Sequence, residues 1–343
     1  KMHSLSFRNA SALNVGGLPH VELVRLVDKI EASAQEGAAR YGWSAAATDW
    51  KAVTRAADID AVIIATPNDS HSEIAIDALE NGKHILCEKP LANELASADE
   101  MALRARNSSQ IAMVNFVYRC WPAVELARRL IASGEIGEVL HFEGRFFQDY
   151  ASDPDLPFSW RFDKDVAGSG AFGDIGSHIS DIALSLVGPI SRVSAVTRRI
   201  HAVRRDQTGG QRPVSVDDLA STLVEFECGA LGTIQASWAA PGHKCDLSFS
   251  ITGSKGSIVF SWERSNELHL YSTADPQLTG GFRRILMGGM HPGAEPFWYA
   301  QAQGIGYAEA FSIVATRFLQ AIATNDKTIG PTFEQGLTAS RFI

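Results

Sequence analysis

The sequence predicts a two-domain α/β protein: a doubly wound parallel sheet in the first third, then a large, mainly antiparallel open sheet. Three observations predict this class. The length of 343 residues corresponds to about two domains of ordinary size. The first third alternates short apolar runs with helical patterns, as βαβ units do. Beyond about Phe116, longer stretches alternate apolar and polar residues between Gly and Asx turns, which is typical of antiparallel strands.

Composition excludes several classes of partner. Hydrophobic residues make up 45% and charged residues 20%, and the net charge is −8 with no basic run, so we expect no nucleic acid and no anionic membrane partner. The four cysteines lie far apart without a C-x-x-C pair, which argues against a zinc knuckle or a disulfide framework and suits reduced thiols in a cytoplasmic protein. No apolar run is long enough to span a membrane.

The first domain is expected to span 1–118. Its predicted strands are 21–27, 61–65, 84–87 and 111–114, and its predicted helices are a first one from about Met2, then 31–41, 72–81 and 97–106. Because these strands are short and apolar, we expect them to be buried on both faces of the sheet.

The second domain is expected to span 119–343. Its predicted strands are 139–147, 194–203, 220–227, 230–238, 246–251 and 257–262, and its predicted helices are 123–132, 177–186, 308–323 and a last one within 336–343. The stretches 206–212 and 274–296 are expected to be surface loops.

Polar residues follow three strands of the first domain, and ligands of such sheets bind at the carboxyl ends of the strands. Asp28, after the strand 21–27, could accept hydrogen bonds from the ribose hydroxyls of a dinucleotide, which would favour NAD over NADP; it could equally cap the next helix. The turn Thr66-Pro67-Asn68 opens a helix whose free N–H groups could face a phosphate or a ribose, although a plain capped turn explains the same residues.

The third strand end carries Glu88-Lys89-Pro90. A Lys before Pro is held extended, and a cis bond to Pro90 would fix its side chain. The residue type alone favours an ordinary surface lysine.

The densest group of polar residues in the second domain lies in the glycine-rich segment 168–181. Asp174 and His178 are four residues apart and share one face if the helix has begun by Asp174. A His can act as a general base at neutral pH, oriented by the Asp, and the glycines would admit a ligand closely. A structural Asp–His pair, or a metal site that includes Asp181, are the alternatives, and the metal site lacks further ligands.

These motifs together resemble a known family. The segments 65–71, 87–91, 159–162 and 173–178 occur in the order and spacing of the glucose–fructose oxidoreductases, inositol dehydrogenases and rhizopine-catabolism proteins (Gfo/Idh/MocA). Within that family the chain most resembles levoglucosan dehydrogenases and related sugar 3-dehydrogenases, through the segments 148–150, 281–283 and 304–307. The resemblance implies an N-terminal Rossmann domain and a C-terminal α/β domain that supports the sugar site and often subunit contacts.

The resemblance also implies roles for individual residues. Lys89, Asp174 and His178 match the catalytic positions, and Tyr118 and Gln148 match positions near the sugar. The positions that match the nicotinamide half of the cofactor site are Thr66, Pro67, Asn68, His71, Glu88, Lys89, Trp160 and Arg161. The family's first strand and G-x-G-x-x-G phosphate loop should precede the helix at Met2, and this sequence contains neither.

The residues and the resemblance lead to one hypothesis: an NAD-dependent oxidoreductase, with NADP possible, that oxidises a secondary hydroxyl of a sugar, anhydrosugar or cyclic polyol. We expect a cytoplasmic homo-oligomer, a dimer or tetramer, with no bound metal. A non-catalytic NAD(P)- and sugar-binding regulator, or an enzyme with a permanently bound nucleotide, are the alternatives.

Overall fold

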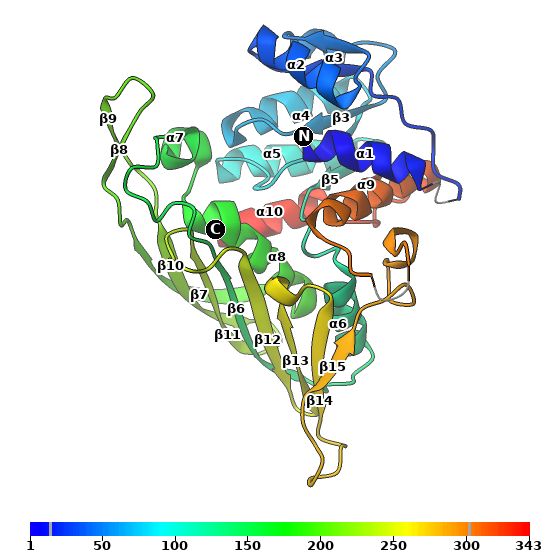
Figure 1. Ribbon diagram of the computed structural model, residues 1–343, viewed down its shortest axis with the longest axis vertical. Helices are drawn as coiled ribbons and strands as arrows, with labels where there is room; N and C mark the ends of the chain where they lie inside the picture. The colour runs from blue at the N-terminus through cyan, green and yellow to red at the C-terminus, as the bar shows by residue number, and fades with distance from the viewer. Residues whose placement is uncertain (14–15, 301–302) are drawn as a thin grey trace. The chain divides into compact units, whose positions relative to one another are not determined.

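The computed structural model describes residues 1–13, 16–300 and 303–343. It contains two compact units (Figure 1): unit 1 is Lys1–Cys120 with Gly306–Thr338, and unit 2 is Trp121–Ile305 with Ala339–Ile343. The division into domains 1–118 and 119–343 stays a prediction, and the units differ from it because residues 306–338 pack with the N-terminal part of the chain. No helix in the described part of the chain is long and apolar enough to cross a membrane.

Unit 1 has two small parallel sheets. Strand β1 (Arg25–Val27) pairs with β2 (Ala45–Ala47), and β4 (His84–Cys87) lies between β3 (Ala61–Ile64) and β5 (Ala112–Val114). Strands β4 and β5 are largely buried, as predicted, whereas β1, β2 and most of β3 remain partly exposed. The expectation of burial on both faces is wrong for β1 and β3, because each pairs on one side only among the described residues; β2 was not predicted as a strand.

The helices of unit 1 cover these sheets. They are α1 (Met2–Ala12), α2 (Glu31–Tyr41), α3 (Trp50–Thr54), α4 (His71–Glu80), α5 (Leu95–Asn107), α9 (Tyr307–Thr324) and the first part of α10 (Phe333–Phe342). Helix α9 belongs to this unit because it packs along α1 (Figure 1): Phe7 meets Phe318 edge to face at 6.1 Å, and Asn9 donates to the Ser312 hydroxyl at 3.0 Å.

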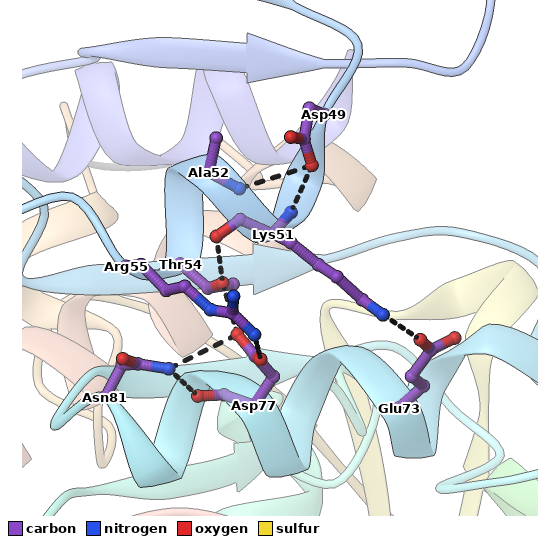
Figure 2. A network of polar contacts seen from close by, with 8 residues as sticks. All are labelled: Asp49, Lys51, Ala52, Thr54, Arg55, Glu73, Asp77 and Asn81. Atoms are coloured by element: carbon purple, nitrogen blue, oxygen red, sulfur yellow. Dashed lines mark hydrogen bonds and ion pairs between the residues drawn. The ribbon is translucent and has the colours of Figure 1, made fainter.

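A polar network fixes α3 against α4 (Figure 2). Asp77 on α4 accepts hydrogen bonds from the Thr54 hydroxyl at 2.5 Å and from the Arg55 guanidinium at 2.7 Å. The Asn81 amide, one turn further along, also reaches the Asp77 carboxylate at 3.3 Å. Burial acts to raise the pKa of Asp77, but the hydrogen bonds from Thr54 and Arg55 outweigh it, and the pKa is lowered.

Unit 2 is built on an eight-stranded sheet in the order β15-β14-β13-β12-β6-β11-β10-β7. Its strands are β6 (Val139–Phe147), β7 (Ile190–Arg198), β10 (Leu219–Phe226), β11 (Leu231–Ser237), β12 (Asp246–Gly253), β13 (Gly256–Ser261), β14 (Glu267–Ser272) and β15 (Arg283–Leu286). The predicted antiparallel character is confirmed, since every pair is antiparallel except β6 with β11.

One face of this sheet holds the core of unit 2. Helices α6 (Pro122–Ala132) and α8 (Ser177–Leu186) pack on it, and alternate strand residues such as Phe142, Phe146 and Phe249 are buried there. The alternation of buried and exposed residues along β6 and β10 follows directly from the two-residue period of a strand.

Three expectations for unit 2 need correction. The predicted strand 194–203 is instead β7, which begins four residues earlier, followed by β8 (Val203–Arg205). The predicted loop 206–212 is part of a hairpin in which β8 pairs with β9 (Gln211–Pro213). The predicted loop 274–296 contains β15, which pairs with β14 at the edge of the sheet. Their charged and polar residues hid the pattern, because edge strands need few apolar side chains.

Candidate active site

In unit 1, the carboxyl end of β4 holds Glu88 in a dense set of hydrogen bonds. Its Oε1 atom lies 2.8 Å from His3 Nε2 on α1 and accepts a bond from the Asn115 amide, also at 2.8 Å. Its Oε2 atom accepts from the backbone N–H of Lys89 at 3.2 Å. Burial acts to raise the pKa of Glu88, but His3, the charge of Lys89 and the Asn115 amide lower it to about 2. Glu88 is therefore an ionised, firmly held carboxylate at neutral pH.

Lys89 follows at the same strand end and is half-buried. The Lys89–Pro90 peptide bond is cis. Pro90 and Leu91 behind it are buried. The catalytic role of Lys89 stays a prediction.

His71 differs from its predicted place. It was expected to line the cofactor, yet the side chain is fully buried at the start of α4. Its Nδ1 atom lies 3.1 Å from the Pro90 carbonyl oxygen and its Nε2 atom 3.1 Å from the Thr66 carbonyl oxygen. Burial lowers the pKa of His71, against the opposing effect of these carbonyls. His71 therefore connects the turn after β3 with the turn after β4, and its side chain has no exposed surface to meet a ligand.

The other strand-end residues of unit 1 form capped turns with accessible polar atoms. Asp28, half-buried after β1, accepts a hydrogen bond from the Ile30 N–H at 2.8 Å, so its capping role is present. After β3, Thr66 is exposed and its hydroxyl lies 2.7 Å from that of Ser70. Pro67 precedes a short 3₁₀ turn, η1 (Asn68–Ser70), in which Asn68 is buried. Their cofactor-binding roles stay predictions.

In unit 2, Asp174 and His178 lie on successive turns of one continuous helical segment. Asp174 is in a π-helical turn, η3 (Phe172–Gly176), and His178 is in the first turn of α8. The helix has thus begun by Asp174, as the argument from spacing required, but through a π turn, which recurs at functional sites. Asp217, on the loop before β10, fixes its start by accepting from the N–H groups of Gly170 and Phe172 at 2.8 and 2.9 Å.

The glycines of this segment allow neighbouring parts of the protein to pack closely against it. A Cβ atom on Gly170 would lie 1.9 Å from the Asp217 carbonyl oxygen, and one on Gly176 would lie 3.0 Å from Ala236 on β11. The expectation that they admit a ligand is therefore corrected at these two positions: the helix must approach the neighbouring backbone and the sheet closely.

The Asp174 carboxylate lines a cavity of about 370 Å³ within unit 2. Its Oδ2 atom accepts a hydrogen bond from the Tyr150 hydroxyl at 3.3 Å and lies 3.7 Å from Arg161 Nε. Leu156, Pro157, Ser159 and Phe162 complete the lining, so the cavity has both an apolar wall and polar groups, as ligand sites have.

Other residues singled out in the sequence also belong to unit 2. His178 is 8% exposed, with its ring 6.1 Å from that of Phe146. Arg161 lies over the ring of Trp160 at 4.4 Å in a 3₁₀ turn, η2 (Trp160–Phe162), which leads into a short helix, α7 (Lys164–Ala167). Asp181 is buried on α8. No group of three or more His, Cys, Asp or Glu side chains in the described ranges could hold a metal ion.

The two residues predicted near the sugar lie in different units. Gln148 follows β6 directly; its backbone N–H donates to the Ser237 carbonyl oxygen at 2.8 Å, and its side chain is half-buried. Tyr118 belongs to unit 1, is 4% exposed, and packs its ring at 6.3 Å from Tyr307. The sugar-binding roles of both stay predictions.

Comparison with known proteins decides the family. Residues 4–116 match the oxidoreductase family domain with an NAD-binding Rossmann fold, and residues 124–259 match the GFO/IDH/MocA C-terminal domain. The chain belongs to the GFO/IDH/MocA oxidoreductase family. It is therefore an oxidoreductase, and the predicted combination of a Rossmann domain with a large open sheet is confirmed.

Its similarity to individual members is high. The chain is 42% identical over 316 residues to a levoglucosan dehydrogenase of Pseudarthrobacter phenanthrenivorans, covering 88% of this chain and 81% of that protein. It is 33% identical over 260 residues to the scyllo-inositol 2-dehydrogenase (NAD(+)) of Bacillus subtilis, covering 75% and 71%. A levoglucosan dehydrogenase solved with NADH and levoglucosan superposes with a TM-score of 0.94 and 40% identity, covering 99% of this chain and 91% of that one.

The polar groups of unit 1 fit such a nucleotide. The half-buried carboxylate of Asp28 can accept hydrogen bonds from ribose hydroxyls, and the exposed hydroxyl of Thr66 at the end of β3 can bond a ribose. Lys89 and Glu88, at the end of β4, supply a cation and an anion at the same edge of their sheet.

Sequence reasoning missed three residues of the site in unit 2. Tyr150 contacts Asp174, Asp217 anchors the helix that bears it, and Arg204 is buried while donating to backbone carbonyls of the segment 151–156. Tyr150 had a signal, because it lies two residues after Gln148 at a strand end. Arg204 had none, since a buried arginine in a stretch of charged residues looks like surface.

Proposed function

We propose that this protein is an NAD-dependent dehydrogenase that oxidises a secondary hydroxyl of a neutral sugar, anhydrosugar or cyclic polyol. The observation that supports it best is the Asp174 carboxylate, contacted by Tyr150 and Arg161 beside a partly apolar cavity, with His178 on the next helical turn. Relatives named as dehydrogenases of levoglucosan and scyllo-inositol point to the same substrate class.

In this proposal His178, Lys89 and Asp174 have separate roles in the reaction. His178 accepts the hydroxyl proton, Lys89 hydrogen-bonds the same oxygen and stabilises its developing negative charge, and Asp174 binds a neighbouring hydroxyl and orients the base. When bound, NAD supplies the acceptor for the hydride that leaves the same carbon.

The remaining predicted residues bind rather than react. Asp28 holds the adenosine ribose; Tyr118 and Gln148 bind sugar hydroxyls. The nicotinamide half is held by Thr66, Pro67, Asn68, Glu88, Trp160 and Arg161.

The charges of the cavity lining favour a neutral substrate. Arg161, the cation of the lining, lies 3.7 Å from the Asp174 carboxylate, which compensates its charge within unit 2. A phosphorylated sugar would need a cation without such a partner, whereas a neutral sugar needs only directional hydrogen bonds.

The decisive experiment follows NADH absorbance while the purified protein is given NAD or NADP with monosaccharides, inositols, levoglucosan and sugar phosphates. We expect NADH to be released with neutral substrates, and NAD to be preferred because Asp28 repels a 2′-phosphate. Binding of nucleotide and sugar without turnover would instead indicate a regulator, and reduction of a nucleotide that never leaves the protein would indicate a permanently bound cofactor.

We also propose that the chain acts as a homo-oligomer in the cytoplasm. Light scattering at working concentration tests the first part and would contradict it with the mass of one chain. Fractionation of cells that produce the protein tests the second.

A further inference from the structure

Tyr150 is held in place by contacts with Trp238, the residue directly after β11. The neighbouring Ala151 donates its N–H to the Trp238 carbonyl oxygen at 2.9 Å, and the rings of Tyr150 and Trp238 meet edge to face at 5.9 Å. The Ala151 carbonyl oxygen in turn accepts from buried Arg204 at 2.7 Å. The backbone on the C-terminal side of Tyr150 is thus fixed by a strand end and by a buried cation.

The fixed phenol points at one atom of the proposed active site. Its hydroxyl donates to Asp174 Oδ2 at 3.3 Å, the atom that also lies 3.7 Å from Arg161 Nε. At 3.3 Å this hydrogen bond is long, but its acceptor is a charged carboxylate, and a donor held at one of its oxygens restricts the rotation of the carboxylate.

The phenol acts only as a donor in this contact. Burial, and then the negative charge of Asp174, raise the pKa of Tyr150 well above its ordinary value. The hydroxyl therefore keeps its proton over the whole working range of a dehydrogenase, so the contact does not switch with pH.

We propose that Tyr150 is a positioning residue: its phenol fixes the Asp174 carboxylate in the orientation in which that carboxylate orients His178 for the reaction. This inference rests on the proposed function for its chemistry, although the contact itself does not. Tyr150 is 39% exposed and lines the cavity, so its hydroxyl can be removed without opening the core.

The test is Tyr150→Phe in the full chain, which keeps the ring against Trp238 and removes only the oxygen. We expect the turnover number to fall about tenfold to a hundredfold, the range for losing a hydrogen bond to a charged group, while KM for the sugar changes less than about threefold. The melting temperature and NADH affinity should stay near those of the unmodified protein. An unchanged turnover number, or a rise in KM alone, would overturn the assignment.

A matched control is Tyr271→Phe on β14, which removes a phenol oxygen from the same unit at a ring that packs on Phe282 outside the cavity lining. We expect its kinetics to equal those of the unmodified protein. Equal losses in both variants would mean that the loss is not specific to Asp174 and would reject the inference.

A second measurement separates this inference from the proposed function. Crystal structures of the unmodified protein and of Tyr150→Phe, both with NADH, need no substrate. We expect the Asp174 carboxylate to rotate or to become disordered in the variant, and an unchanged, well-ordered carboxylate would refute the inference. If no sugar is oxidised but the carboxylate does move, the proposed function fails while the positioning role stands.

Discussion

Glu88 in unit 1 and Asp174 in unit 2 are carboxylates of similar exposure that differ in the lengths of their polar contacts. Their side chains are 23% and 21% exposed. Glu88 accepts bonds of 2.8, 2.8 and 3.2 Å, one of them from the backbone, whereas the phenol and guanidinium beside Asp174 lie at 3.3 and 3.7 Å. Short bonds suit a group that keeps one fixed orientation, at a strand end and beside a bound nucleotide, and longer contacts suit a group that must share its oxygens with a sugar. Exposure alone does not distinguish the two roles.

Lys89→Ala should give the largest effect, and it tests whether the residue next to Glu88 takes part in the chemistry. Removal of a group that stabilises developing negative charge should lower turnover about 10²–10⁴-fold. NADH affinity, measured by fluorescence titration, should change little. Turnover near that of the unmodified protein would remove Lys89 from the mechanism.

His178→Asn tests whether His178, on α8 of unit 2, is the general base. As the base, His178 must be neutral, so turnover in the unmodified protein should rise with pH as the imidazole loses its proton. The variant should lose most of its activity together with this acidic limb, while sugar binding survives. A lowered melting temperature with normal turnover per folded molecule would show instead that His178 is structural.

Glu88→Gln tests whether Glu88 supports the fold as strongly as its bonds indicate. Because the pKa of Glu88 in the folded protein is lowered to about 2, its ionised form stabilises the fold above the ordinary value of 4.5. We expect the variant to be less stable by about 1–3 kcal/mol at pH 7. The difference should shrink as pH falls from 4.5 towards 2, and thermal unfolding at several pH values measures it. A difference independent of pH would contradict this account.

Asp77→Asn should give the smallest effect, because the network between α3 and α4 lies near solvent. The pKa of Asp77 is lowered, so its contribution exists above the ordinary value of 3.8 and disappears as pH falls through the folded value. We expect a loss of about 0.5–1 kcal/mol at pH 7, reduced further by salt. Turnover should be unchanged, and a large loss of activity would show that the network supports the site.

The sequence predicted elements with strong periodicity and missed those whose stability comes from distant contacts. The helices 31–41 and 177–186 and the strands 84–87 and 139–147 have the predicted bounds. Strand β15 was missed because a polar edge strand gives a weak alternation, whereas β14, which lies between two strands and alternates regularly, was overlooked.

The same contrast applies to the candidate site. Motifs within a few residues, such as 88–90 and 174–178, were recognisable from their order and spacing. Contacts between segments far apart in the chain were not: Tyr150 with Asp174 and Arg204 with Ala151 depend on how β6, η3 and β8 meet in the folded unit. The burial of His71 was likewise invisible, because its partners are carbonyl oxygens, which every residue possesses.

The buried guanidinium of Arg204 holds one wall of the cavity through its backbone alone. It donates to the carbonyl oxygens of Ala151, Asp153 and Leu156 and lies 4.4 Å over the ring of Phe162. Every residue has a carbonyl oxygen whatever its side chain, so the hydrogen bonds from Arg204 do not depend on the side chains at 151, 153 and 156. A substitution at Leu156, which lines the cavity and offers Arg204 only its carbonyl oxygen, can therefore change which substrates the wall accepts while the backbone keeps its course. A lysine at 204 could not replace it, because one ammonium lacks the planar fork that spans three carbonyls.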